Sequence, residues 1–75
     1  MDETKTKLEE QPKLTKREAE TLQFLSDGLN HEQIAEEMGI SRKTISNYCD
    51  KIRSKYGNRK MLEIVKLAVQ QKIIK

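Results

Sequence analysis

Residues 31–55 carry two short amphipathic patterns separated by a single glycine. In the first pattern, Ile34, Ala35 and Met38 recur at helical spacing and define one apolar face. Gly39 ends this pattern, and a second helical pattern follows it. The apolar residues of the second pattern are Ile45, Cys49, Ile52 and Tyr56. Two helices joined by a short turn that contains glycine are typical of a helix-turn-helix motif.

The second helix of this motif carries its polar residues away from its apolar face. Steps of about 100° per residue place four residues opposite Ile45, namely Lys43, Asn47, Asp50 and Ser54. In a DNA groove, such central residues reach base edges and flanking residues reach phosphates. Asn47 suits adenine and Lys43 suits guanine. The residues predicted to contact DNA are Arg42, Lys43, Thr44, Ser46, Asn47, Asp50, Lys51, Arg53 and Ser54.

Charge is distributed unevenly along the chain. Residues 41–60 contain seven basic residues and one acid, a net charge of +6, whereas the whole chain has a net charge of +3. Such a basic block indicates a polyanionic partner, although an ordinary solvated helix face has the same composition. The single acid, Asp50, either accepts from a cytosine amino group or balances charge locally by pairing with Lys51, Arg53 or Asn47.

Composition excludes several classes of protein. Seventy-five residues form at most one small domain. No segment approaches the roughly 20 apolar residues of a membrane span, and residues 1–13 lack the apolar stretch of a secretory signal. Cys49 is the only cysteine, and His31 has no partner at ligand spacing. We expect no enzyme, no cofactor, no metal and no membrane partner, and a bacterial or phage-encoded cytoplasmic protein associated with the nucleoid.

The chain divides into a flexible charged tail, residues 1–13, and a helical domain, residues 14–75. The tail is polar and has no periodicity. Thr15 and Glu18 have the spacing of a capping box, which predicts that the first helix begins here and runs to about Asp27.

The other two helices of the motif have start signals of their own. The second helix is predicted at about 31–38, with Asn30 and Gln33 in capping-box positions. The recognition helix is predicted at about 42–56 and is capped by Ser41.

A fourth helix is predicted at about 59–72, with Asn58 as its cap. Its apolar arc is wider than the stripe that packing on one small core requires. We expect a second copy of the chain to cover the excess, although a small core that wraps both sides of the helix is the alternative. The predicted dimerisation residues are Leu62, Ile64, Val65, Leu67, Ala68 and Val69.

Over residues 14–74 the chain resembles the LuxR/FixJ-type DNA-binding domain, in particular the free-standing GerE-like form. The family opens with Leu-Thr-x-Arg-Glu, and Leu14–Glu18 reads LTKRE. The family's Thr-Val-Lys corresponds to Thr44–Ser46, and its Ile-x-x-Lys-Leu-Gly corresponds to IRSKYG at Ile52–Gly57. The resemblance implies an all-α domain of four helices, in which the third reads DNA and the fourth forms a two-fold dimer.

Several residues depart from the family pattern. Ser46 replaces a basic residue, Tyr48 replaces a histidine, and Asp50 stands where a basic residue is frequent. Asn58 and Met61 also differ from the usual Val and Arg. The base contacts of relatives therefore do not transfer to this recognition helix.

These patterns predict a sequence-specific transcription regulator that binds double-stranded DNA as a homodimer. Met1 and the charged tail favour a free-standing regulator over an excised domain. One alternative is a module like sigma-factor region 4, which would bind promoter DNA together with RNA polymerase. The other is a protein-binding adaptor that uses the acidic second helix. The operator and the sign of regulation do not follow from the sequence.

Overall fold

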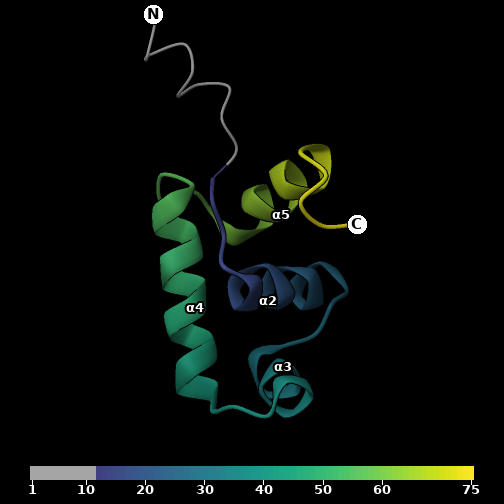
Figure 1. Ribbon diagram of the computed structural model, residues 1–75, viewed down its shortest axis with the longest axis vertical. Helices are drawn as coiled ribbons and strands as arrows, with labels where there is room; N and C mark the ends of the chain where they lie inside the picture. Colours follow the sequence, from purple (N-terminus) through teal and green to yellow (C-terminus); the bar gives the residue numbers. More distant parts are fainter. Residues whose placement is uncertain (1–11) are drawn as a thin grey trace, which may run out of the picture.

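The computed structural model describes residues 12–75, and this part of the chain contains four α-helices and no strand. The helices are α2 (Lys16–Ser26), α3 (His31–Met38), α4 (Arg42–Lys55) and α5 (Met61–Gln70), labelled as in Figure 1. Both α2 and α3 pack against α4, and α5 packs against α2 (Figure 1). The predicted all-α, four-helix fold is confirmed. Residues 1–11 of the predicted tail lie outside the described residues.

The helix starts follow the predicted capping chemistry. In the first capping box, the Glu18 backbone N–H donates to Thr15 Oγ1 at 3.1 Å, and the Thr15 N–H donates to Glu18 Oε1 at 3.0 Å. In the second box, the Gln33 N–H donates to Asn30 Oδ1 at 2.8 Å, and the Asn30 N–H donates to Gln33 Oε1 at 2.9 Å. Ser41 caps α4. Each cap satisfies N–H groups that have no partner within the helix.

The turn between α3 and α4 depends on the backbone of Gly39. Gly39 has φ of 69°, a left-handed conformation that a Cβ atom disfavours. Its N–H donates to the Glu36 carbonyl at 3.3 Å, and the Ile40 N–H donates to the Ala35 carbonyl at 3.0 Å. This pair of bonds closes α3 and sends the chain directly into the Ser41 cap of α4.

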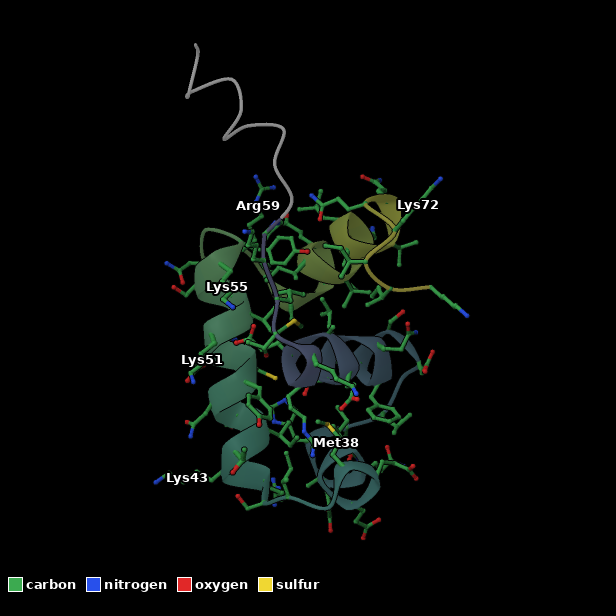
Figure 2. All side chains as sticks on the ribbon, viewed as in Figure 1. Met38, Lys43, Lys51, Lys55, Arg59 and Lys72 are labelled. Atoms are coloured by element: carbon green, nitrogen blue, oxygen red, sulfur yellow. The ribbon has the colours of Figure 1, made fainter. Side chains whose placement is uncertain are left out.

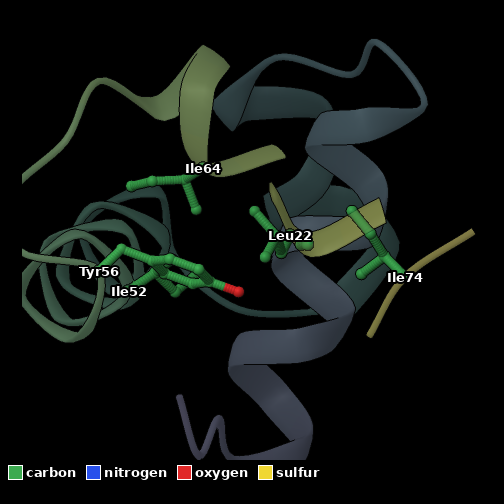
Figure 3. Packing of buried hydrophobic residues seen from close by; sticks show 6 residues of the cluster. Leu22, Ile52, Tyr56, Ile64 and Ile74 are labelled. Atoms are coloured by element: carbon green, nitrogen blue, oxygen red, sulfur yellow. The ribbon is translucent and has the colours of Figure 1, made fainter. Parts of the chain in front are cut away.

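The core consists of two clusters that share α4. The first cluster contains Leu22, Ile52, Tyr56, Ile64, Ala68 and Ile74 (Figure 3). The second cluster contains Ile34, Ala35, Ile45 and Cys49. The N-terminal half of α4 thus packs with α3, and its C-terminal half packs with α2 and α5. Leu25 and Met61 are partly buried against both clusters and connect them.

The start of α5 differs from the prediction. Asn58 is not its cap, because Asn58 has φ of 61° and a capping residue needs an extended backbone. The Asn58 N–H instead closes α4 by donating to the Arg53 carbonyl at 2.6 Å. Lys60 occupies the cap position without a side-chain hydrogen bond. The helix α5 runs from Met61 to Gln70 and is therefore shorter at both ends than the predicted range of 59–72.

The residues after α5 return to α2. Ile74 is 5% exposed and belongs to the first cluster. The Lys75 backbone N–H donates to Gln23 Oε1 at 2.9 Å. These contacts fix the end of the chain on the side of α2 that α4 does not cover (Figure 1).

The end of α5 repeats the hydrogen-bond pattern of α3, but with lysine in place of glycine. The Lys72 N–H donates to the Val69 carbonyl at 3.0 Å, and the Ile73 N–H donates to the Ala68 carbonyl at 2.9 Å. Lys72 has φ of 63°, and its Cβ makes this left-handed conformation unfavourable.

We expect Lys72→Gly to raise the free energy of unfolding by about 1 kcal/mol, because it removes the Cβ from a left-handed position. Urea denaturation at neutral pH measures this change. Lys72→Ala is the matched control, since it removes the same charged side chain and keeps the Cβ. Equal stabilisation by both variants would show that the charge, not the backbone, is responsible.

Candidate nucleic-acid interface

α4 has a buried side and an exposed side along its whole length. The buried side consists of Ile45, Cys49, Ile52 and Tyr56, each at most 7% exposed. Eight of the nine residues predicted to contact DNA are exposed, and the ninth, Thr44, is half-buried. Lys43 and Lys51 lie along the outer edge of α4, away from α2 and α3 (Figure 2). The structure therefore brings the predicted set together on one accessible surface.

The N-terminal end of α4 is strongly positive. Arg42 and Lys43 are exposed in its first turn, which contains no acidic residue. The helix macrodipole is also positive at this end, so two cations here are unfavourable unless an anion is bound. The Thr44 hydroxyl lies 2.9 Å from Ser41 Oγ, and the Thr44 N–H donates to the same atom at 3.1 Å. Thr44 thus contributes to the cap as well as to the flank of the surface.

Asp50 pairs with Arg53 on the exposed side of α4. Arg53 Nη2 donates to Asp50 Oδ1 at 2.8 Å, and the two side chains are 45% and 67% exposed. Of the two accounts of Asp50 that the sequence leaves open, local pairing is thus present. An exposed pair of this kind stabilises the fold by at most about 1 kcal/mol. Its main local effect is to place a positive charge beside the Asp50 carboxylate.

Lys55 has a role that sequence reasoning missed. Its Nζ donates to Glu18 Oε1 at 2.6 Å and to the Lys13 carbonyl at 2.9 Å. The Glu18 side chain is only 3% exposed. This contact joins the C-terminal turn of α4 to the first turn of α2 across 37 residues of sequence. The sequence predicted that Glu18 forms a capping box with Thr15. It did not predict the contact with Lys55, because that contact depends on how α2 packs on α4.

The pKa of the Glu18 carboxyl reflects these contacts. Burial by itself raises this pKa, but hydrogen bonds from Lys55 and from the Thr15 N–H outweigh that effect, and the charges of Lys55 and Lys51 add to them. The net result is a pKa below the ordinary value for glutamate. Glu18 is therefore ionised at neutral pH in spite of its burial.

His31 and Cys49 lie together between α3 and α4. Cys49 Sγ is 3.6 Å from His31 Nε2, and Cys49 is 4% exposed within the second core cluster. Burial raises the pKa of the Cys49 thiol, with Arg53 opposing this shift and Asp50 adding to it. Within residues 12–75, no group of three histidine, cysteine or acidic side chains is arranged to hold a metal ion. None of the helices in that range is long and apolar enough for a membrane span.

The exposed side of α3 is acidic. Glu32, Glu36 and Glu37 are all exposed there. Phosphates would be repelled from this helix and attracted to α4, so the charges separate the supporting helix of the motif from the helix that can approach a polyanion.

This arrangement is that of a helix-turn-helix domain, with α3 as the supporting helix and α4 as the exposed one. The model of the luxR family of bacterial regulatory proteins, called GerE, matches residues 12–68. The chain therefore belongs to the luxR family of bacterial regulatory proteins.

Curated relatives agree with this family. The Fimbriae Z protein of Salmonella typhimurium is 33% identical over 61 residues, which cover 81% of this chain and 29% of that protein. The DNA-binding transcriptional activator EvgA of Escherichia coli is 32% identical over 60 residues, with 80% and 29% covered. The virulence-factor transcription regulator BvgA of Bordetella pertussis is 34% identical over 55 residues, with 73% and 26% covered. The chain thus spans less than a third of the length of these relatives.

We expect Glu18→Gln to lower the free energy of unfolding at neutral pH by about 2 kcal/mol, because Lys55 loses its charged acceptor. Since folding lowers the pKa of Glu18, ionised Glu18 contributes its full share to the free energy of unfolding above the ordinary glutamate pKa. This contribution disappears as the pH falls through the lower pKa of the folded state. Between about pH 5 and pH 3, the wild type should therefore lose stability more steeply than the variant.

Chemical denaturation across this pH range measures the difference. Glu20→Gln is the control, because the Glu20 pair with Arg17 is exposed and 3.4 Å long. Parallel stability curves for wild type and Glu18→Gln would contradict an ionised Glu18 that is stabilised by Lys55.

Proposed function

We propose that this protein is a sequence-specific regulator of transcription that places α4 in the major groove of double-stranded DNA. The observation that carries the proposal is the side of α4 that faces away from the core, which is exposed over its full length and carries basic and amide side chains. Membership of the luxR family supports the same function. A regulator of this kind acts on the chromosome, and we accordingly place it in the bacterial cytoplasm.

The exposed side of α4 suggests a division of roles. Lys43 and Asn47 lie opposite the buried side, where they can reach guanine and adenine edges. Arg42 and Lys51 lie on the two flanks, where they can reach phosphates. The phosphate contacts would supply most of the affinity and make it fall with rising salt. The direct contacts to bases would supply the preference for one sequence.

The DNA for this test is a duplex that the wild-type protein selects from a randomised library. We expect the double variant Lys43→Ala, Asn47→Ala to bind this duplex about 100-fold more weakly, because each base contact contributes roughly 1–3 kcal/mol of discrimination. Fluorescence anisotropy with duplex DNA measures the affinity. The control is Lys66→Ala, which removes an exposed cation from α5. Unchanged operator affinity in the double variant would exclude α4 as the helix that reads DNA.

We further propose that two copies associate through α5. Leu62 is 70% exposed and Val69 is 42% exposed, and the half-buried Val65 lies between them on the same side of the helix. Their spacing of three and four residues forms one apolar stripe. Two-fold association would place two α4 helices in successive major grooves, roughly 34 Å apart.

The other three predicted dimerisation residues lie elsewhere. Ile64 and Ala68 are fully buried in the core of the single chain, so they cannot reach a partner surface. Val65 and Leu67 both pack partly against the first cluster, but helical steps of about 100° place only Val65 on the side of Leu62 and Val69. The proposed contact therefore consists of the stripe of Leu62, Val65 and Val69.

We expect Leu62→Lys to convert a dimer into a monomer without loss of folding, because the charge is tolerated at this exposed position only while no second copy covers it. Sedimentation equilibrium measures the mass, and circular dichroism checks the fold. Gln70→Lys adds the same charge to the opposite flank of α5 and should remain dimeric. A monomeric wild type, or a dimeric Leu62→Lys, would refute association through this stripe.

A further inference from the structure

Asp50 is the only acid in the basic block of residues 41–60, and it lies on the side of α4 that carries Lys43 and Ser54. Helical steps of about 100° place Asp50 some 40° from Ser54, which faces directly away from Ile45. Its side chain is 67% exposed. A carboxylate at this position contacts the same partner as the basic side chains around it. If the partner is DNA, the carboxylate either lowers the affinity by repelling phosphates or accepts a hydrogen bond from a base.

The pair with Arg53 decides how this carboxylate can act. Arg53 Nη2 occupies Oδ1 at 2.8 Å, and no other hydrogen-bond donor of residues 12–75 is bonded to the carboxylate. Arg53 offsets the negative charge beside the phosphates and limits the rotation of the side chain. Oδ2 remains available as a hydrogen-bond acceptor on the exposed side of the pair.

We propose that Asp50, held by Arg53, is a specificity-determining residue that accepts a hydrogen bond from the N4 amino group of a cytosine in the major groove. In that groove only cytosine N4 and adenine N6 donate, whereas guanine and thymine present acceptors to a carboxylate. Adenine also places its N7 acceptor beside the donor, so cytosine is the better match. Arg53 acts as a positioning residue through Asp50. This inference rests on the proposed binding of α4 to the major groove.

Selection of sites from a randomised duplex library tests the inference with the full chain. Wild type should recover a cytosine at one fixed position of each half-site, preferred about tenfold over the other bases. Asp50→Ala should lose the preference at that position alone and keep the others. Asp50→Asn should replace cytosine by adenine there, because an amide pairs with adenine N6 and N7.

Variants of Arg53 separate orientation from charge. Arg53→Ala should reduce the preference for cytosine without changing the preferred base, and Arg53→Lys should restore part of it. If Asp50→Ala prefers the same bases as wild type, the carboxylate makes no specific contact with a base. That result would overturn the role of Asp50. If wild type shows no salt-dependent binding to any duplex, the proposed function fails as well. Salt-dependent binding with no preference at the Asp50 position refutes the role of Asp50 alone.

Discussion

The burial of one side of α4 is the constraint on which the rest of the structure depends. Ile45 and Cys49 pack with α3, and Ile52 and Tyr56 pack with α2 and α5, so a single stripe holds both core clusters. A domain of this size has few other apolar residues with which to build a core. Because the whole stripe faces inward, the opposite side of α4 must face solvent. The surface proposed for DNA is thus a direct result of how the chain folds.

Local signals in the sequence predicted much of this arrangement. The capping boxes at Thr15 and Asn30 and the end of the second helix at Gly39 depend only on residues a few positions apart, and the structure confirms them. The period of the apolar residues likewise placed the core side of α4. In contrast, Asn58 looked like a cap because its residue type suits one, but its N–H is used to close α4. Local composition cannot show which of two adjacent helices uses such a residue.

Features that depend on contacts between distant residues did not follow from the sequence. The approach of Lys55 to Glu18 requires the packing angle of α2 on α4, and the return of Lys75 to Gln23 requires the path of the chain after α5. The wide apolar arc of α5 indicated more than one contact surface, but it did not show which apolar residues belong to the core and which are exposed. Burial assigns Ile64 to the core and leaves Leu62 exposed. The pairing of Asp50 with Arg53 was one of several options that the spacing allowed.

The bond from Lys55 to the Lys13 carbonyl has a consequence for how the domain is joined to other molecules. It holds the start of the described chain beside the C-terminal end of α4, while Lys43 lies near the other end (Figures 1 and 2). The fourteen residues of α4 span about 20 Å at the rise of an α-helix. A fluorophore attached at Lys13 would therefore lie at the end of α4 remote from its first turn. This attachment point suits a label that must not cover Arg42 and Lys43.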